Sequence, residues 1–184
     1  MITAERARAI RLLALDVDGV LTDNAIFLGP VRGDRVELKR FDIQDGLGHT
    51  LLRSTDIEVA WVSGRESEAT TLRARELQVP TLLQVTKARK LPAMEALLRE
   101  RGLEWRELAY VGDDLADLPV LRRAGLPIAV ANAVDEAKHL AAFVTSAAGG
   151  HGAVREVIVA LLRARGEWEG AVARYLAERG EPAA

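Results

Sequence analysis

Cysteine is absent from the 184-residue chain and histidine is scarce, with only His49, His139 and His151. The lack of cysteine excludes disulfide bonds, thiolate nucleophiles, cysteine-ligated zinc and iron–sulfur clusters. Three histidines argue against an all-histidine metal site, and we interpret His49 and His139 as surface or helix-packing residues. Any metal is therefore expected to be a hard cation held by carboxylate oxygens.

The chain also lacks an excess of charge of one sign and any long apolar segment. Lysine and arginine number 25, and aspartate and glutamate number 27, so the net charge is −2. This balance argues against a nucleic-acid partner. No segment approaches the roughly 18 consecutive apolar residues of a membrane helix, and no signal-peptide pattern follows the N-terminal arginines. We therefore expect a cytoplasmic protein with neither a membrane nor a nucleic-acid partner.

Length and composition indicate one globular domain. Hydrophobic residues make up 49% and charged residues 28% of the chain, which is ordinary for such a domain. The length also corresponds to about one domain. We expect residues 1–184 to form a single domain whose last residues, 180–184, are frayed.

Strand-like and helix-like stretches alternate along the chain. Short apolar runs typical of buried parallel strands lie at 12–15, 57–62 and 108–111, with weaker copies at 126–130 and 143–145. Helical patterns cover 66–77, 91–101, 116–124, 134–140 and 153–176, the last with a possible break at Gly166. This alternation predicts an α/β domain with a doubly wound, mainly parallel sheet.

One stretch departs from the alternation. Two short apolar segments, 25–28 and 36–39, flank the glycine- and proline-containing stretch Gly29–Asp34. Two short strands around such a turn predict a β-hairpin, which we place at residues 24–40 as an insertion after the first strand. The insertion is only hairpin-sized and the later segments follow the core pattern, so we expect no large cap domain.

Polar residues follow the predicted strands at the points where these strands end. Asp16 and Asp18 follow the first strand, Ser63 follows the second, and the pair Asp113 and Asp114 follows a later one. In open α/β sheets, ligands bind beyond the carboxyl ends of the strands. These side chains are therefore expected to gather at one rim of the sheet.

Clustered carboxylates repel one another, so such a rim requires a cation. Mg²⁺ takes oxygen ligands and neutralises phosphate charge. A carboxylate beside it, such as Asp16, stays ionised and is able to attack phosphorus, and a second one, Asp18, is placed to act as acid and base. Lys90, with Lys87 as a competing candidate, and Ser63 would bind the phosphoryl oxygens. Each residue alone is common in caps and turns, but their combination indicates phosphoryl transfer.

The motifs that carry these residues resemble those of the haloacid dehalogenase superfamily of aspartate-nucleophile phosphohydrolases. The four motifs correspond to residues 16–23, Ser63, Lys90 and residues 112–114. More narrowly, the segment from Asp16 to about Ile158 is similar to the 3-deoxy-D-manno-octulosonate 8-phosphate phosphatase family. The narrower similarity includes Asp45-Gly46-x-Gly48, residues 110–117 and the Gly-Gly-x-Gly segment that begins at Gly149.

The resemblance implies a role for each carboxylate of the rim. Asp16 would be the nucleophile and a Mg²⁺ ligand, and Asp18 would be the general acid and base and bind Mg²⁺ through its backbone carbonyl. Asp113 would be the third protein ligand, with Asp114 supporting the metal shell. Asp117 would either support this shell or begin a helix, and both interpretations stay open.

The resemblance also implies groups that hold the phosphoryl oxygens and the rest of the substrate. Ser63 and Lys90 would bind the phosphoryl group, to which Gly64 would offer its backbone N–H. The fork of Arg65 suits a substrate carboxylate or phosphate, although a surface arginine at a helix end is an equal alternative.

Two further residues concern the choice of substrate. Arg155 would reach an anionic substrate or form a salt bridge on its own helix. His151 departs from the family, whose Gly-Gly-x-Gly pattern commonly has arginine there, and histidine is shorter and only partly charged near neutral pH. We expect a small sugar phosphate as substrate. The first candidate is 3-deoxy-D-manno-octulosonate 8-phosphate, from lipopolysaccharide biosynthesis, and the alternatives are a nine-carbon acylneuraminate-type 9-phosphate or another sugar phosphate.

The family implies an assembly as well, because in it the hairpin builds a homotetramer and a neighbouring subunit closes each capless site. We therefore expect a homotetramer, with an ordinary surface flap as the alternative for the hairpin.

Outside the phosphatases, a phosphorelay receiver domain shares the sheet, the Mg²⁺ and a phosphorylated aspartate, but its acidic pair and that aspartate come from different strands. A catalytically silent assembly protein and a phosphomutase are further alternatives. A dinucleotide-binding enzyme is disfavoured because no Gly-x-Gly-x-x-Gly follows the first strand.

Overall fold

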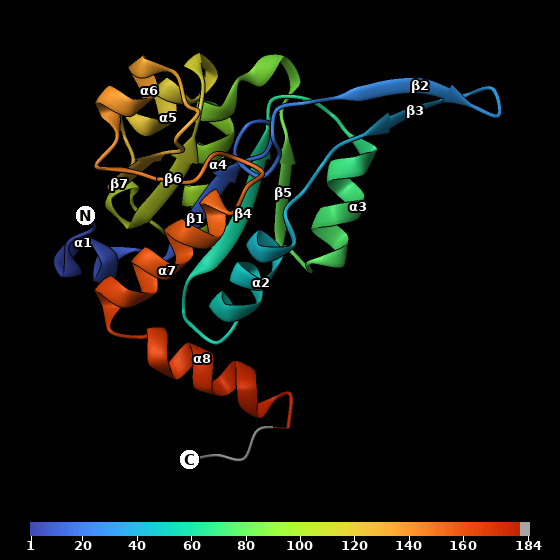
Figure 1. The fold of residues 1–184 in the computed structure, drawn as a ribbon. Helices are drawn as coiled ribbons and strands as arrows, with labels where there is room; N and C mark the ends of the chain where they lie inside the picture. Colours follow the sequence, from blue (N-terminus) through green and yellow to red (C-terminus); the bar gives the residue numbers. More distant parts are fainter. Residues whose placement is uncertain (181–184) are drawn as a thin grey trace.

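Six parallel strands form the central sheet of the computed structural model, which describes residues 1–180 (Figure 1). Their order across the sheet is β5-β4-β1-β6-β7-β8. The strands are β1 (Leu12–Asp16), β4 (Glu58–Ser63), β5 (Thr81–Gln84), β6 (Leu108–Gly112), β7 (Leu126–Ala129) and β8 (Phe143–Val144). When the six strands are numbered 1 to 6 along the chain, their order in the sheet is 3-2-1-4-5-6, which is the order of a doubly wound α/β sheet. The predicted fold class is confirmed.

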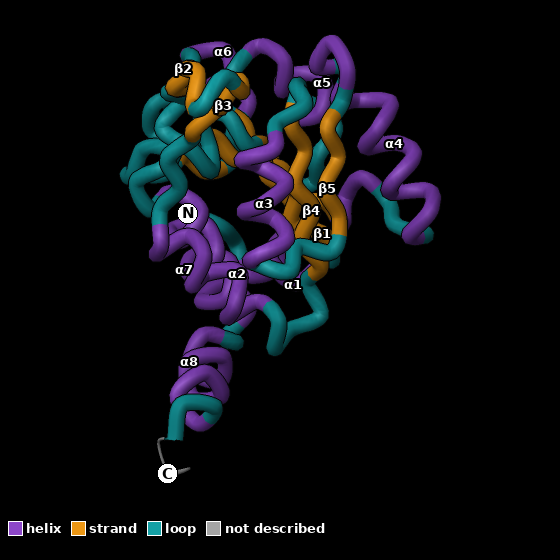
Figure 2. Tube along the Cα trace, turned by 90° about the vertical axis from the view of Figure 1, so that its right-hand side faces the viewer, coloured by secondary structure: helices purple, strands orange, loops and turns teal. Residues whose placement is uncertain are grey.

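Helices cover both faces of the sheet. They are α1 (Ala4–Ala9), α2 (Ile43–Leu52), α3 (Glu68–Glu76), α4 (Lys90–Arg101), α5 (Leu118–Leu121), α6 (Asp135–Leu140), α7 (Ala153–Arg165) and α8 (Trp168–Ala177). In Figures 1 and 2, α2, α3 and α7 lie on one side of the sheet, and α4 and α5 lie on the other. Helix α1 packs on α7, while α8 extends below the sheet in Figure 1.

The apolar runs of the sequence become the core of the sheet. Every residue of β1 and β6 is buried, and the large side chains of Trp61 and Tyr110 are fully enclosed. Strands covered on both faces read as continuous apolar runs rather than as an alternation. For this reason the three strongest predicted strands agree with β1, β4 and β6 to within one residue.

The strand order reverses between β1 and β6, which are neighbours in the sheet. From β1 the chain proceeds to β4 and β5 on one side, whereas β6, β7 and β8 extend the other side. In open α/β sheets, ligands bind in the crevice at such a reversal, beyond the carboxyl ends of the strands. Asp16 ends β1 and Asp113 follows β6, so the fold places both at this crevice.

The predicted insertion contains a two-stranded hairpin, but its turn is tighter than expected. Strands β2 (Phe27–Val31) and β3 (Asp34–Leu38) pair around Arg32 and Gly33, whose φ angles are 52° and 92°. Two positive φ angles are typical of a two-residue type I′ turn. The predicted six-residue turn was wrong because Pro30, assigned to it, lies within β2, and proline is tolerated in an edge strand.

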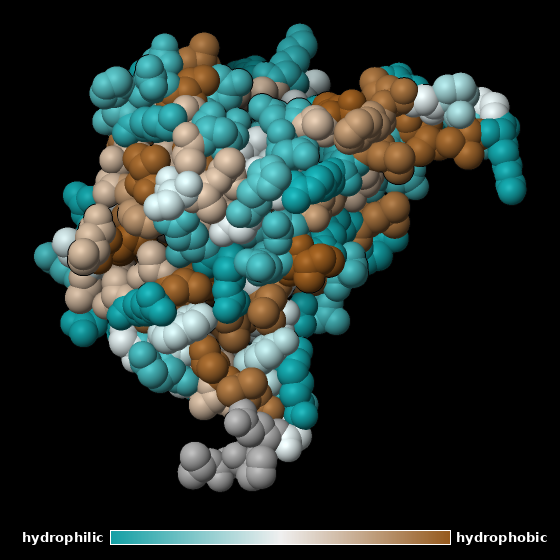
Figure 3. Space-filling view, in the orientation of Figure 1, coloured by the Kyte–Doolittle hydropathy of each residue, from teal (hydrophilic) through white to brown (hydrophobic). Residues whose placement is uncertain are grey.

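The hairpin projects from the domain and carries exposed apolar side chains (Figures 1 and 3). Phe27, Leu28, Val31 and Leu38 are each more than half exposed. Within residues 1–180, no larger segment interrupts the alternation of strands and helices. The expectation of no large cap is therefore confirmed for the described chain.

Three elements were not predicted: α1, α2 and the short edge strand β5. Helix α2 contains Gly46 and Gly48, which weaken an isolated helix. Packing favours both glycines, because a Cβ at Gly46 would lie 2.8 Å from Arg73 Nη2 and one at Gly48 would lie 2.9 Å from Ile158 Cδ1, so these side chains would have to move. The predicted break at Gly166, which has a φ of 75°, is confirmed and separates α7 from α8.

No helix among residues 1–180 has the length and apolar character needed to cross a membrane. Most of the tail predicted to be frayed, residues 181–184, lies outside the described residues. Gly180, the last described residue, belongs to the turn that follows α8.

A buried polar network joins α2 to β4 and α7. His49 is almost fully buried, with Nδ1 2.8 Å from the carbonyl oxygen of Asp45 and Nε2 2.9 Å from the indole nitrogen of Trp61. Because Nε2 accepts the indole N–H, the ring proton lies on Nδ1 and the imidazole is neutral. Asp45 in turn accepts the backbone N–H of Arg155 at 2.7 Å, at the start of α7. His49 is therefore a helix-packing residue, whereas His139 is exposed.

The burial of His49 predicts a pH-dependent contribution to stability. Burial lowers the pKa of His49 to about 4, whereas a histidine in an unfolded chain titrates near ~6.5. As the pH falls below that unfolded value, the unfolded state binds a proton that the native state does not. The native protein therefore loses about 2 kcal/mol of this contribution between pH 7 and pH 5.

The matched variant is His49→Gln, which keeps an acceptor for Trp61 but does not titrate. Urea unfolding of both proteins at each pH gives the difference in their free energies of unfolding. We expect the advantage of the native protein to shrink by about 2 kcal/mol from pH 7 to pH 5. A difference that stays constant with pH would contradict the prediction.

Candidate active site

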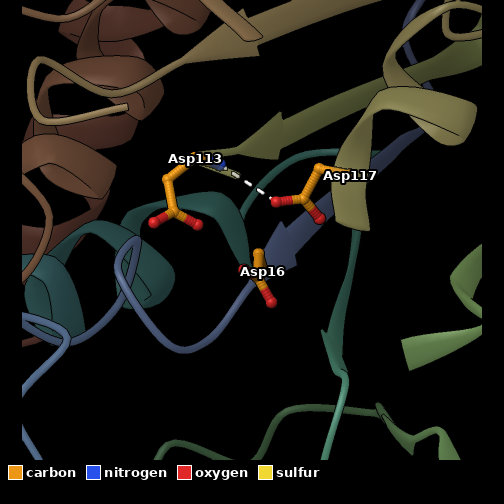
Figure 4. A group of neighbouring side chains, drawn as sticks. All are labelled: Asp16, Asp113 and Asp117. Carbon is orange, nitrogen blue, oxygen red and sulfur yellow. Dashed lines mark hydrogen bonds between the residues drawn. The ribbon is translucent and has the colours of Figure 1, made fainter. Parts of the chain in front are cut away.

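Three carboxylates meet where β1 and β6 end. Asp16 is the last residue of β1, Asp113 follows β6, and Asp117 ends the short 3₁₀ turn that precedes α5. All three residues are buried, and one carboxylate oxygen of each lies within 4.8 Å of the others. Figure 4 shows the three side chains around a shared space at the rim of the sheet.

Lys90 supplies an ammonium to this cluster. It begins α4 and is buried, with Nζ 2.6 Å from Asp16 Oδ1 and 2.7 Å from Asp117 Oδ1. Lys87, the competing candidate, is exposed and lies in the turn before α4, where its φ is 57°. The structure therefore brings Lys90, rather than Lys87, to the expected nucleophile.

Asp117 is held through both of its carboxylate oxygens. Oδ1 accepts from Lys90 and, at 2.6 Å, from the Tyr110 hydroxyl, while Oδ2 accepts the backbone N–H groups of Asp113 at 3.0 Å and Asp114 at 3.2 Å. The sequence left open whether Asp117 supports the metal shell or begins a helix. In the structure it does part of each, because it binds the backbone of the turn before α5 and also holds Lys90 of the cluster. Tyr110 begins the matched segment 110–117, but no role was predicted for it, because a single hydroxyl in an apolar strand does not show which residue it contacts.

Burial and repulsion determine the protonation of the cluster. Burial, followed by the charge of Asp117, raises the pKa of Asp16 well above its ordinary range and that of Asp113 to about 6. Burial alone would lower the pKa of Lys90, but the charges of Asp16 and Asp117 outweigh it and leave that pKa above its ordinary value. Three buried carboxylates thus share one buried ammonium, which leaves an excess of negative charge.

This excess fits a divalent cation. Asp113 Oδ1 is buried without a hydrogen-bond partner, which is costly unless a cation or water contacts it. Mg²⁺ takes such hard oxygen ligands, and Asp16 and Asp113 are the side chains that would hold it, with the backbone carbonyl of Asp18 as the further expected ligand.

Asp114 was expected to support the metal. Its carboxylate instead accepts the backbone N–H of the next residue at 2.7 Å and is exposed, so the structure does not bring it into the cluster.

Asp18 and Ser63 are neighbours across the rim. Ser63 Oγ lies 3.4 Å from Asp18 Oδ2 and 2.9 Å from the backbone carbonyl of Arg65. Asp18 Oδ1 lies 2.6 Å from Nζ of Lys39, which follows strand β3 of the hairpin. Lys39 was not singled out in the sequence, because a lysine at the end of a hairpin strand is normally solvated.

A cavity of about 200 Å³ opens beside Asp16, Asp18 and Lys90, whereas Ser63 is fully buried and is not among the residues that line it. Its lining residues are Asp16, Asp18, Asn24, Gly64, Arg65, Ala88, Lys90, Asp113, Asp114, Ala116 and Asp117. Arg65 Nη2 is paired with Glu37 Oε2 at 2.6 Å, whereas its Nη1 is buried without a partner. At Gly64, a Cβ would lie 2.8 Å from Ala88, so a side chain would crowd the wall of the cavity.

Arg155 and His151 do not line this cavity. The guanidinium of Arg155 lies 5.3 Å from the ring of Trp168, because it follows the side of α7 that meets α8, so the structure does not bring it to the carboxylates. The ring of His151 lies 3.4–3.5 Å from Arg40 Nη1, which donates to the carbonyl of Gly150 at 2.7 Å. Arg40, which the sequence analysis missed, thus places a guanidinium beside the position that is commonly arginine in the family.

The loop that carries His151 packs directly on the loop after β1. A Cβ at Gly149 would overlap the carbonyl oxygen of Gly19, and a Cβ at Gly150 would overlap the backbone nitrogen of Asp23. Asn132 bridges the two loops, donating to the Gly19 carbonyl at 3.1 Å and accepting the N–H of Gly149 at 2.6 Å. His151 and Arg40 are therefore fixed beside the loop that follows the expected nucleophile.

Comparison with known proteins agrees with this geometry. Residues 80–158 match the haloacid dehalogenase-like hydrolase family. The 3-deoxy-D-manno-octulosonate 8-phosphate phosphatase KdsC of Escherichia coli (strain K12) is 43% identical over 162 residues, which cover 88% of this chain and 84% of that protein.

Solved structures show the same fold. A 3-deoxy-D-manno-octulosonate 8-phosphate phosphatase from Moraxella catarrhalis, in complex with magnesium ion, phosphate ion and a KDO molecule, has a TM-score of 0.87 and 37% identity, covering 94% of this chain and 97% of that one. The cobalt-bound phosphatase from Haemophilus influenzae has a TM-score of 0.80 and 35% identity, covering 89% of this chain and 93% of that one.

A doubly wound sheet with an acidic pair after its first strand and a lysine salt-bridged to the first of those acids defines a haloacid dehalogenase-type hydrolase. This architecture separates the chain from the receiver domains considered above. The identity extends over most of both sequences, and the chain belongs to the 3-deoxy-D-manno-octulosonate 8-phosphate phosphatase family. The resemblance inferred from the motifs is confirmed.

The contrast between Asp113 and Asp114 predicts unequal effects on Mg²⁺ binding. Asp113→Asn removes one charge from the buried cluster, whereas Asp114→Asn removes the same charge from an exposed residue. We expect the first variant to lose about 10- to 100-fold in Mg²⁺ affinity and the second to lose less than about threefold. Isothermal titration with MgCl₂ measures both, and equal losses would show that Asp114 is a ligand after all.

Proposed function

We propose that this protein is a Mg²⁺-dependent phosphomonoesterase that hydrolyses 3-deoxy-D-manno-octulosonate 8-phosphate to the free sugar acid and phosphate. The observation that carries the chemistry is the 2.6 Å contact between Lys90 Nζ and Asp16 Oδ1. It places an expected nucleophile and a cation for the phosphoryl oxygens at one point of the cavity. Membership of the family supports the substrate, and this substrate would place the protein in lipopolysaccharide biosynthesis.

The reaction would proceed in two displacements. A carboxylate oxygen of Asp16 attacks phosphorus, the bond from phosphorus to the sugar oxygen breaks, and Asp18 donates a proton to the departing oxygen. Asp18 then takes a proton from a water molecule, which attacks phosphorus and releases Asp16 and phosphate. Mg²⁺, when bound, neutralises charge on the carboxylates and the phosphoryl group.

The remaining groups of the rim would stabilise the charge that redistributes on phosphorus. Lys90 keeps its proton because two carboxylates raise its pKa, so it presents a permanent cation to the phosphoryl oxygens. Gly64 lines the cavity and would offer its backbone N–H, and Ser63 would offer the hydroxyl that lies 3.4 Å from Asp18 Oδ2. Such donors, fixed before the reaction, are effective because they need no reorganisation in the transition state.

Two sets of cations would recognise the acidic sugar. Arg65 lines the cavity and has a buried guanidinium nitrogen without a partner, as a substrate-binding arginine would. The pair Arg40 and His151 lies beside the loop after β1 and would offer a charge to the sugar carboxylate. Arg155, directed toward Trp168, is not proposed to contact substrate within this subunit. A nine-carbon acylneuraminate-type 9-phosphate stays the alternative substrate because His151 departs from the family pattern.

The assembly and organisation that we propose follow the family. The exposed apolar side chains of the hairpin, Phe27, Leu28, Val31 and Leu38, support a homotetramer in which a neighbouring subunit covers the open cavity. We also propose that the chain acts as a single phosphatase domain with the hairpin, residues 24–40, as its insertion. Its cytoplasmic location stays a prediction.

Asp16→Asn tests the nucleophile directly. The amide has nearly the same shape but cannot attack phosphorus as an anion, so we expect at least a 10³-fold loss of kcat, or about 4 kcal/mol in transition-state energy. Phosphate release from 3-deoxy-D-manno-octulosonate 8-phosphate measures it, with folding verified by circular dichroism. Full Mg²⁺-dependent turnover by the variant would exclude the mechanism.

A phosphate-release screen tests the substrate. We expect kcat/KM to be higher for the eight-carbon acid phosphate than for hexose phosphates that lack a carboxylate. Arg40→Ala should lower kcat/KM for the acid by about tenfold, since one charge-assisted contact of about 1.5 kcal/mol is lost, and should leave hexose phosphates nearly unchanged. A preference for hexose phosphates would refute the narrow assignment but keep the phosphatase class.

A further inference from the structure

Lys39, at the base of the hairpin, is a buried cation beside the site. The mechanism described above assigns it no role. The side chain of Lys39 is fully buried although β2 and β3 are largely exposed. Its Nζ forms an ion pair with Asp18 Oδ1 at 2.6 Å, although without the angles of a hydrogen bond, and lies 3.2 Å from Thr70 Oγ1 and 3.8 Å from Glu37 Oε1. A lysine is rarely buried unless it is paired. Of the two carboxylates near Lys39, that of Asp18 is closer than that of Glu37.

The base of the hairpin is held firmly, so Lys39 has a defined place. Phe41 forms an isolated antiparallel bridge with Thr22, and its ring stacks on Trp61 at a centroid distance of 6.2 Å. On the same face of the strand as Lys39, Glu37 accepts the hydroxyl of Ser67 at 2.6 Å. Residues on both sides of Lys39 are thus tied to the domain.

Asp18 depends on this contact more than its neighbours in the cluster do. It lies in the loop beyond β1, and Ser63 Oγ, at 3.4 Å, is its other side-chain contact among the described residues. Asp16, in comparison, ends a wholly buried strand and meets Lys90. An acid or base group must lie within hydrogen-bond reach of the proton that it transfers, and a displacement of about 1 Å can cost roughly 100-fold in rate.

We propose that Lys39 is a positioning residue, which holds the carboxylate of Asp18 in the orientation needed for proton transfer to the leaving oxygen. This inference rests on the proposed function, because it takes Asp18 as the acid and base. The hairpin thereby contributes to the chemistry within its own subunit, in addition to any contact that it makes with another copy.

The absence of cysteine from the chain allows a chemical rescue test. Lys39→Cys creates a unique thiol, which bromoethylamine alkylates in the unfolded protein; refolding then returns an ammonium to the end of a chain of lysine length. We expect Lys39→Cys to lower kcat/KM for 3-deoxy-D-manno-octulosonate 8-phosphate by about 100-fold. Aminoethylation should recover at least about tenfold of this loss. Arg35→Ala, an exposed position on the same face of β3, is the matched control and should change nothing.

A second substrate separates positioning from general damage. The phenolate of p-nitrophenyl phosphate departs without a proton, so its kcat/KM should fall less than about tenfold in Lys39→Cys. Equal losses on both substrates, or no gain in activity after the variant has been alkylated and refolded, would overturn the proposal. If the native protein hydrolyses hexose phosphates rather than the sugar acid phosphate, the substrate assignment fails alone, and the same comparison is made with a hexose phosphate.

Discussion

Repulsion among buried carboxylates is the constraint on which this structure depends. Asp16, Asp113 and Asp117 approach one another at the sheet reversal, and Lys90 is the buried ammonium that contacts two of them. Like charges at this distance oppose ionisation, so the cluster keeps its charge only with a compensating cation. That requirement is consistent with the lysine that begins α4 and with the magnesium ion in the related phosphatase from Moraxella catarrhalis. The excess negative charge that destabilises the cluster without a metal also favours the binding of a divalent cation, and that cation in turn favours a phosphoryl group.

The site is assembled from elements that are distant in sequence. β1 contributes the acidic pair, β4 contributes Ser63, and the hairpin contributes Lys39 against Asp18. Residues 1–180 contain no large cap, and the hairpin has two parts with different properties. Its base carries Lys39 and Glu37, which contact the cavity-lining Asp18 and Arg65, whereas its strands expose apolar side chains. In the assembly that we propose, one short segment would serve both catalytic geometry and subunit contact.

The sequence predicted the parts of the fold and site that local pattern determines. Apolar runs that end at Asp16, Ser63 and Gly112 located the strands, because strands buried on both faces leave such runs. Lys39 and Tyr110 were not predicted, since their functional surroundings arise from contacts with Asp18 and Asp117 that only the folded chain creates. The glycine-rich α2 was missed for a similar reason: tertiary packing, rather than helix propensity, selects its residues.

The position of β1 has a consequence for synthesis of the chain. Among the six strands of this sheet β1 comes first in the chain, yet it lies in the middle of the sheet between β4 and β6. The helix before it is secured late as well, because Arg165 near the end of α7 donates to the carbonyls of Ala7 and Ile10. Domains form as units while the ribosome extends them. Because both neighbours of β1 come later in the chain, this strand cannot pair until they have been made, and the helix before it gains its contacts to Arg165 only once α7 is present.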